Sequence, residues 1–165
     1  GDLAAGAVAG VKAEHGLVIP HRETLGLTDL CRQLVDYYGI LAEHLQLGLD
    51  GENLAIRGDR LMLQRAIGNL LVNAIHHTPP TGRVTLAVRR RDGMAEIVVG
   101  NSGPQIPAEA LRTIFERFVR ADQGGEGSGL GLAIARSIVV AHGGGIAASS
   151  SGQLTEFVIT LPLAD

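Results

Sequence analysis

The chain has 165 residues, 45% of them hydrophobic and 19% charged, which is enough for one domain with a core of its own. Its net charge is −3 and it has no long run of Lys or Arg, which argues against a nucleic-acid surface. The single cysteine, Cys31, excludes an intrachain disulfide and fits a reducing compartment, and no apolar stretch is long enough to span a bilayer.

Hydrophobic periodicity and turn residues predict the elements of the N-terminal half. Residues 11–23 have no clear period, which indicates a linker. Thr28 can cap a helix that continues to about His44, and two short strands are predicted at residues 46–50 and 53–57.

The next helix has the clearest signals in the chain. Asp59 can cap it, an apolar period continues over residues 60–77, and the turn residues 78–82 end it. The remaining chain is predicted to form two β-hairpins, a short helix and one longer helix. In order these are strands 83–91 and 94–99 around Asp92-Gly93, a short helix from Pro107, a helix from Ser128 to about His142, and strands 146–150 and 154–161.

Helices together with a largely antiparallel sheet predict an α/β sandwich. Glycines alternate in the segment that enters its last helix, Gly127-Ser128-Gly129-Leu130-Gly131-Leu132. A helix N-terminus attracts anions, and glycine lets a phosphate approach the backbone closely, so this segment predicts a nucleotide site. A Rossmann fold is excluded because no strand precedes the segment, and a P-loop is excluded because no Gly-Lys-Ser/Thr closes it.

Two carboxamides, Asn69 and Asn73, lie four residues apart and therefore on one face of the predicted helix 60–77. Their oxygens can ligate a hard cation such as Mg²⁺ when phosphates supply further ligands. The alternative is a polar pair on a solvated helix face.

Residues 101–107 follow the second predicted hairpin strand directly. Asn101 at the end of that strand could hold an adenine edge, and the alternative is an ordinary turn.

Residues 114–120 contain two of the three phenylalanines. Phe115 and Phe118 are expected in the core. Arg117 and Arg120 could reach phosphates in a fork geometry, or could be solvated.

Together and in this order, these segments resemble the four boxes of the ATP-binding domain of sensor histidine kinases, in the superfamily shared with gyrase and Hsp90. The boxes are residues 69–78 (asparagine box), 101–107 (first glycine box), 114–120 (phenylalanine box) and 127–133 (second glycine box). The resemblance extends from about Leu27 to Leu163. The residues of the four motifs are most similar to those of kinases that sense copper, silver and other heavy metals.

The resemblance implies a Bergerat-type fold, an α/β (α+β) two-layer sandwich. Its mixed, mostly antiparallel five-stranded sheet is expected to pack on about three helices. A flexible ATP lid is expected at residues 123–126. Residues 25–165 would form this catalytic domain, and residues 1–24 would be a linker from a preceding dimerisation and phosphoacceptor region.

The resemblance also assigns roles at the phosphate end. Asn73 stands where the family binds Mg²⁺, and Asn69 where metal and phosphates are supported. His76 takes the place of a basic residue that contacts phosphate. The amides around Gly129, Leu130, Gly131 and Leu132 would cradle the phosphates.

At the adenine end, the sequence departs from the family pattern. His77 stands where an aromatic residue stacks on adenine. Asn101 replaces an Asp that accepts a hydrogen bond from the adenine amino group, which its carbonyl oxygen can also do. Gly103 and Ile106 keep the pattern of the box, whereas Gln105 replaces its second glycine.

The implied reaction is in-line transfer of the γ-phosphoryl group of ATP to a histidine. Gyrase-like ATPases carry a water-activating Glu where Asn69 stands, so its absence favours a kinase. The phosphoacceptor box of the family, a His followed by Glu or Asp within a long helix, is not recognised in this sequence. His21 is a poor candidate, because it lies in the predicted linker beside Pro20. The isolated domain is therefore expected to bind ATP as a monomer without phosphorylating itself.

The expected context is a longer, homodimeric receptor kinase of the bacterial inner membrane, with this domain on the cytoplasmic side. Its partners would be its own dimerisation domain and a response regulator. Two alternatives remain open: a serine kinase of the anti-sigma type, and a non-catalytic module that binds a partner protein. The second is motivated by Asn101 and His77.

Overall fold

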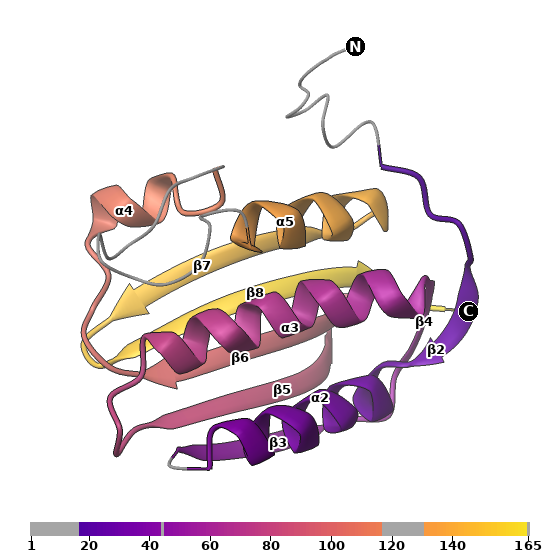
Figure 1. The fold of residues 1–165 in the computed structure, drawn as a ribbon. Coiled ribbons are helices and arrows are strands. Elements are labelled where there is room, and N and C mark those ends of the chain that lie inside the picture. The colour runs from indigo at the N-terminus through magenta and orange to yellow at the C-terminus, as the bar shows by residue number, and fades with distance from the viewer. Residues whose placement is uncertain (1–16, 44, 117–130, 165) are drawn as a thin grey trace.

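The computed structural model describes residues 17–164 apart from residue 44 and residues 117–130 (Figure 1). It contains a five-stranded sheet in the order β3-β5-β6-β8-β7. In that order the strands are β3 (Gln46–Gly51), β5 (Arg83–Arg91), β6 (Met94–Ser102), β8 (Leu154–Pro162) and β7 (Gly145–Ser151). β3 pairs with β5 in parallel and all other neighbours are antiparallel, which confirms the predicted mixed, mostly antiparallel sheet.

Three longer helices form a second layer on one face of this sheet (Figure 1). They are α2 (Leu27–Leu41), α3 (Arg60–His76) and α5 (Gly131–Ala141), and α3 contacts both of the others. A short helix, α4 (Ala108–Arg112), follows β6 and begins one residue after the predicted start, with Pro107 as its N-cap. The predicted two-layer sandwich is confirmed.

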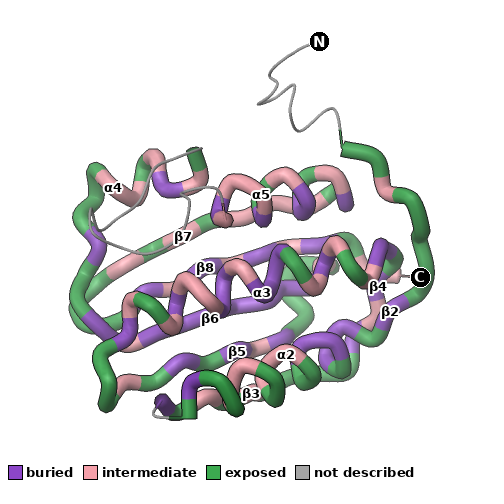
Figure 2. Tube along the Cα trace, in the orientation of Figure 1, coloured by how far each residue is buried: buried purple, intermediate pink, exposed green. Residues whose placement is uncertain are grey.

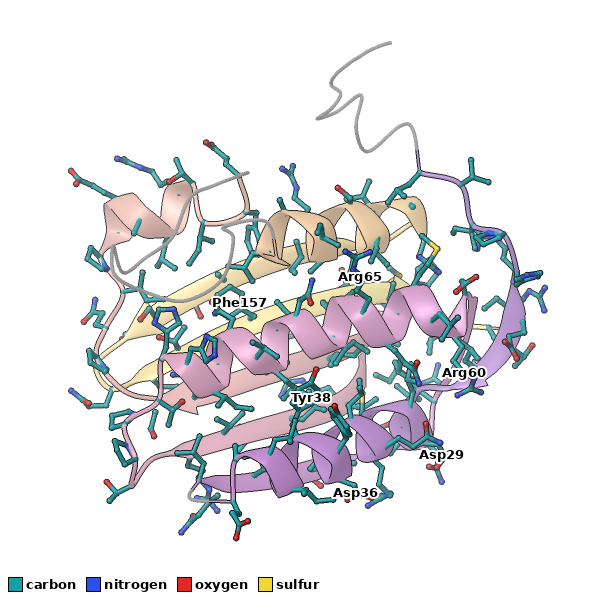
Figure 3. All side chains as sticks on the ribbon, viewed as in Figure 1. Asp29, Asp36, Tyr38, Arg60, Arg65 and Phe157 are labelled. Carbon is teal, nitrogen blue, oxygen red and sulfur yellow. The ribbon has the colours of Figure 1, made fainter. Side chains whose placement is uncertain are left out.

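The core lies between these two layers and is mostly aliphatic. β8 buries alternate residues, Thr155, Phe157, Ile159 and Leu161, as expected of a strand with one covered face. Phe157 is fully buried between the sheet and the helices (Figure 3). The central strand β6 is buried along nearly its whole length, because strands flank it on both sides (Figure 2).

The hairpin β5–β6 turns at Asp92-Gly93, as predicted. Both residues have positive φ, +53° and +77°, which is what a two-residue turn of type I′ requires. β6 continues beyond the predicted end at residue 99, because β5 pairs with it as far as Asn101 and β8 as far as Ser102. The prediction that Asn101 follows the strand is therefore wrong.

A second, two-stranded sheet was not predicted. β2 (Glu23–Gly26) pairs antiparallel with β4 (Ala55–Gly58). β4 overlaps the strand predicted at residues 53–57, whereas β2 is only four residues long, and a period of two cannot be recognised over so few residues. The buried pair Leu25 and Ile56 anchors this sheet to the core.

The two predicted helix caps have different outcomes. Asp59 caps α3 as predicted, because its carboxylate accepts the backbone N–H of Met62 at 3.0 Å. Thr28 does not cap α2, which begins after Gly26 and ends at Leu41, before the predicted end. Thr28 is instead buried, and its hydroxyl donates to the carbonyl of Glu52.

Among the residues that the structure describes, no helix combines the length and apolarity needed to cross a membrane.

On the inner side of α2, Tyr38 projects towards α3, where its hydroxyl lies close to Gly68 (Figure 3). Cys31 of the same helix is fully buried, and this burial raises the pKa of its thiol to about 12.

The burial of Cys31 predicts a thiol that does not react in the native state, because the reactive thiolate is scarce and the sulfur is inaccessible. With a thiol-specific chromogenic reagent at pH 8, we expect no reaction in buffer and one equivalent in denaturant. The variant Leu61→Cys, at a side chain 74% exposed, should react with one equivalent immediately. Rapid modification of Cys31 in folded wild-type protein would contradict this prediction.

Candidate nucleotide-binding site

α3 carries the paired asparagines, and the first of them, Asn69, contacts the start of α5. Asn69 and Asn73 are both half-buried, and they share a face because four residues make about one turn. The Nδ2 of Asn69 donates to the carbonyl oxygen of Gly131 at 2.9 Å. The contact joins the asparagine segment to the glycine segment, which lies far away in the sequence.

The two carboxamides have different surroundings. Asn69 is fixed through its side-chain nitrogen to α5, whereas the side chain of Asn73 makes no hydrogen bond with another described residue, although its backbone carbonyl accepts the N–H of His77. The carboxamide of Asn73 is therefore available for a ligand that faces this side of α3. Its oxygen is the type of donor that a hard cation such as Mg²⁺ prefers.

Asn101 near the end of β6 is only 4% exposed. Its Nδ2 donates to the carbonyl oxygen of Ser102 at 3.1 Å, and its Oδ1 accepts no hydrogen bond from the residues that the structure describes. Because a buried carbonyl oxygen without a partner is costly, this acceptor suits a ligand that donates an N–H.

Sequence reasoning missed a second buried polar residue, Thr155, which pairs with Asn101 across β6 and β8. Its hydroxyl lies 2.7 Å from that of Ser150, which also accepts the backbone N–H of Ile106 at 2.8 Å. These bonds tie the loop after β6 to the edge strand β7. The available signal was a threonine at an inward position of an otherwise apolar, alternating strand.

Gly103 brings the end of β6 against the end of α3. Its φ is +147°, and a Cβ at this position would lie 2.8 Å from the carbonyl oxygen of His77. Its N–H donates to the carbonyl of Gln153 at 3.0 Å, so the loop is held from both sides. Only glycine combines this backbone conformation with this approach.

The other predicted site residues divide into two groups. His76 is exposed in the last turn of α3, His77 follows as the C-cap, and Gly131 and the buried Leu132 begin α5. The rest of the predicted set lies outside the described residues: Arg117, Arg120, Gly127, Ser128, Gly129, Leu130 and the expected lid.

A two-layer sandwich that brings paired asparagines to a helix N-terminus, beside a buried acceptor at a strand end, defines an ATP-binding domain of the Bergerat type. In agreement with this geometry, residues 58–165 match the family described as "Histidine kinase-, DNA gyrase B-, and HSP90-like ATPase". The chain belongs to this family, within which it is the ATP-binding catalytic domain of a sensor histidine kinase.

Individual relatives agree with this assignment. The chain is 40% identical over 157 residues to the sensor histidine kinase CusS of Escherichia coli K12, covering 92% of this chain and 33% of CusS. It is also 40% identical over 122 residues to the probable sensor kinase SilS of Salmonella typhimurium, covering 72% of this chain and 24% of SilS. The chain thus spans at most about a third of these relatives.

A solved structure has the same fold. The mycobacterial sensor histidine kinase MprB superimposes with a TM-score of 0.78 at 30% sequence identity. The match covers 86% of this chain and 98% of the MprB chain.

The contact between Gly103 and His77 predicts a large effect of Gly103→Ala. The added Cβ would be strained at this φ and would clash with the backbone of α3, so we expect a loss of about 1–3 kcal/mol in the free energy of unfolding. Urea denaturation measures it. The matched control is Gly48→Ala in β3, where no atom lies within 4 Å of the added Cβ. Equal stability of the two variants would refute the constraint.

Proposed function

We propose that this domain binds ATP together with Mg²⁺ and presents the γ-phosphoryl group for in-line transfer to a histidine of a separate dimerisation domain. The observation that carries this proposal is the hydrogen bond from Asn69 to Gly131, because Asn73 lies one turn further along the same face of α3. A metal ligand next to a helix N-terminus is suited to a metal-bound polyphosphate.

Mg²⁺ fits the residues that are present. Asn73 would contribute its carboxamide oxygen, and water and phosphate oxygens would complete the ligand set, as is usual for this ion. When bound, Mg²⁺ supplies positive charge that stabilises the transferring phosphoryl group. Asn69 would keep α5 in place, and the amides at Gly131 and Leu132 would face the phosphates.

At the adenine end, Asn101 would accept a hydrogen bond from the exocyclic amino group through its Oδ1. The bond from its Nδ2 to Ser102 supports this, because it leaves the oxygen available for the base. His77 would lie against the adenine ring. The acceptor is neutral, so it would select an amino group without adding charge to the site.

The residues of α3 support a kinase rather than an ATPase. The helix contains no Asp or Glu along its whole length, and Asn69 is occupied by a hydrogen bond to Gly131. A carboxylate would be needed there to activate water as a nucleophile. Without one, bound ATP would persist until a histidine acceptor arrives.

The wider context is proposed from the resemblance. The full-length protein would be a homodimeric kinase of the bacterial inner membrane with this domain on the cytoplasmic side, acting on a response regulator. The motif residues that this chain shares with kinases that sense copper, silver and other heavy metals support a metal ion as its signal.

Asn73→Ala tests the metal ligand. We expect the affinity for a fluorescent ATP analogue in the presence of Mg²⁺ to fall about tenfold or more, equivalent to about 1.4 kcal/mol. The difference between titrations with Mg²⁺ and with a chelator should also vanish. The matched control is Asn53→Ala, at an exposed asparagine outside the candidate site. Retention of Mg²⁺-dependent binding by Asn73→Ala would exclude this role.

Asn101→Leu tests the adenine acceptor, because leucine has a similar size and no acceptor. We expect a loss of about tenfold in ATP affinity, the effect of one buried hydrogen bond. Asn101→Asp keeps an acceptor and should bind ATP at least as tightly as wild type. Competition between ATP and GTP measures selectivity, and undiminished preference for ATP in Asn101→Leu would contradict the assignment.

A further inference from the structure

A buried histidine holds the far end of α5 on the start of α3. His142 directly follows α5 and is 4% exposed. Its Nε2 accepts the backbone N–H of Asp59 at 3.1 Å, and its Nδ1 lies 2.8 Å from the carbonyl oxygen of Ile138. The first contact requires an acceptor and the second a donor, so the ring is neutral with its proton on Nδ1.

Asp59 connects this histidine to α3, because the same residue is the N-cap. Its carboxylate holds the N–H of Met62 inside the first turn, while its own N–H points to His142. α3 and α5 therefore run antiparallel and are joined at two places. Asp59 meets His142 at one end of α5, and Asn69 meets Gly131 at the other.

The surroundings leave the imidazole little freedom. A Cβ on Gly58 would lie 2.6 Å from Cδ2 of His142 and 2.8 Å from its Nε2. In the turn that follows, a Cβ on Gly144 would lie 1.9 Å from the carbonyl oxygen of Thr160. Backbone therefore packs closely beside both the ring and the turn after it.

We propose that His142 is a positioning residue for nucleotide binding, which sets where the N-terminus of α5 lies relative to Asn69 and Asn73. The apolar packing of α5, through Ala135, Ile138 and Val139, is not directional and permits small shifts along the helix. The hydrogen bond from Asp59 is directional and defines one position. α5 is about 16 Å long and rigid, so a shift at His142 moves Gly131 as well.

This role requires the neutral imidazole. Protonation would place an N–H on Nε2, facing the N–H of Asp59, and break the contact. Burial lowers the pKa of His142, against the opposing effect of the Ile138 carbonyl. The charged groups that act on it are Arg22, which also lowers the pKa, and Asp59, which raises it. His21 in turn faces Asp59.

The direction of the pH dependence follows from this lowered pKa. Above the ordinary histidine value of about 6.5 the ring is neutral in both the folded and unfolded chain, and pH has no effect through it. Below that value the unfolded chain takes up the proton first. The stability that the neutral ring contributes is therefore lost as the pH falls below about 6.5, and the contact at Asp59 breaks in the folded protein when the ring takes up a proton at its lower pKa.

The proposal rests on the proposed function and is tested by nucleotide titration of three chains. His142→Leu removes the acceptor and the donor, and at pH 8 its affinity for the ATP analogue should fall about fivefold to tenfold, as for one buried hydrogen bond. His142→Gln keeps an acceptor and a donor and should restore binding to within about twofold of wild type. As the pH falls from 7.5 towards the lower pKa of His142, wild type should lose affinity relative to His142→Gln, because the two chains differ only at residue 142.

Two further variants separate positioning from general stability. Gly58→Ala pushes away the ring and the end of the Leu63 side chain while His142 is unchanged, so it should reproduce the loss of affinity. Val88→Ala removes buried volume in β5 and should lower stability without changing affinity. If His142→Leu does not fold, Gly58→Ala and the pH comparison of wild type with His142→Gln still test the positioning role of His142.

The possible failures are distinguishable. No binding of the Mg²⁺–ATP analogue by wild type would refute the proposed function. Normal wild-type binding combined with full affinity in Gly58→Ala, or with the same pH profile for wild type and His142→Gln, would refute the positioning role alone. Equal loss of affinity in Val88→Ala would also refute it.

Discussion

The antiparallel packing of α3 against α5 is the contact on which the candidate site depends. α3 buries one side, including Leu63, Ile67 and Leu70, in the core, where each such side chain contributes about 1.5–3 kcal/mol. That burial fixes the rotation of the helix, which places Asn69 against Gly131 of α5 and Asn73 one turn further along the same face. Half-burying two carboxamides costs free energy, and the bond from Asn69 to Gly131 offsets part of that cost.

Much of the fold could be predicted because its signals are local. Asp59, the apolar period of α3 and Asp92-Gly93 each act through residues that are neighbours in the chain. The failures occur where a distant partner decides the outcome. β2 exists because β4 pairs with it, and the hydroxyl of Thr28 is drawn away from its expected cap role by the carbonyl of Glu52.

The same distinction applies to the candidate site. Helical periodicity predicts that the two asparagines share one helix face. That they lie beside the glycine segment could be expected only from the family resemblance, because no local signal indicates the contact of Asn69 with Gly131. Thr155 was missed because its position opposite Asn101 depends on strand register. His142 resembles an ordinary helix end followed by glycines, and its bond to Asp59 appears only when α5 lies beside α3.

The adenine end of the candidate site is formed by strands and the phosphate end by helices, so the two ends differ in what holds their residues in place. Asn101 and Thr155 lie in adjacent strands whose ladder fixes them, so the base would meet a rigid surface. Asn69, Asn73 and Gly131 belong to helices joined by side-chain hydrogen bonds, which small shifts can weaken. The close approach of Gly103 to His77 links the two ends. Under the proposed function, base selection would therefore depend on strand register, whereas binding of metal and phosphates would depend on how the two helices are held together.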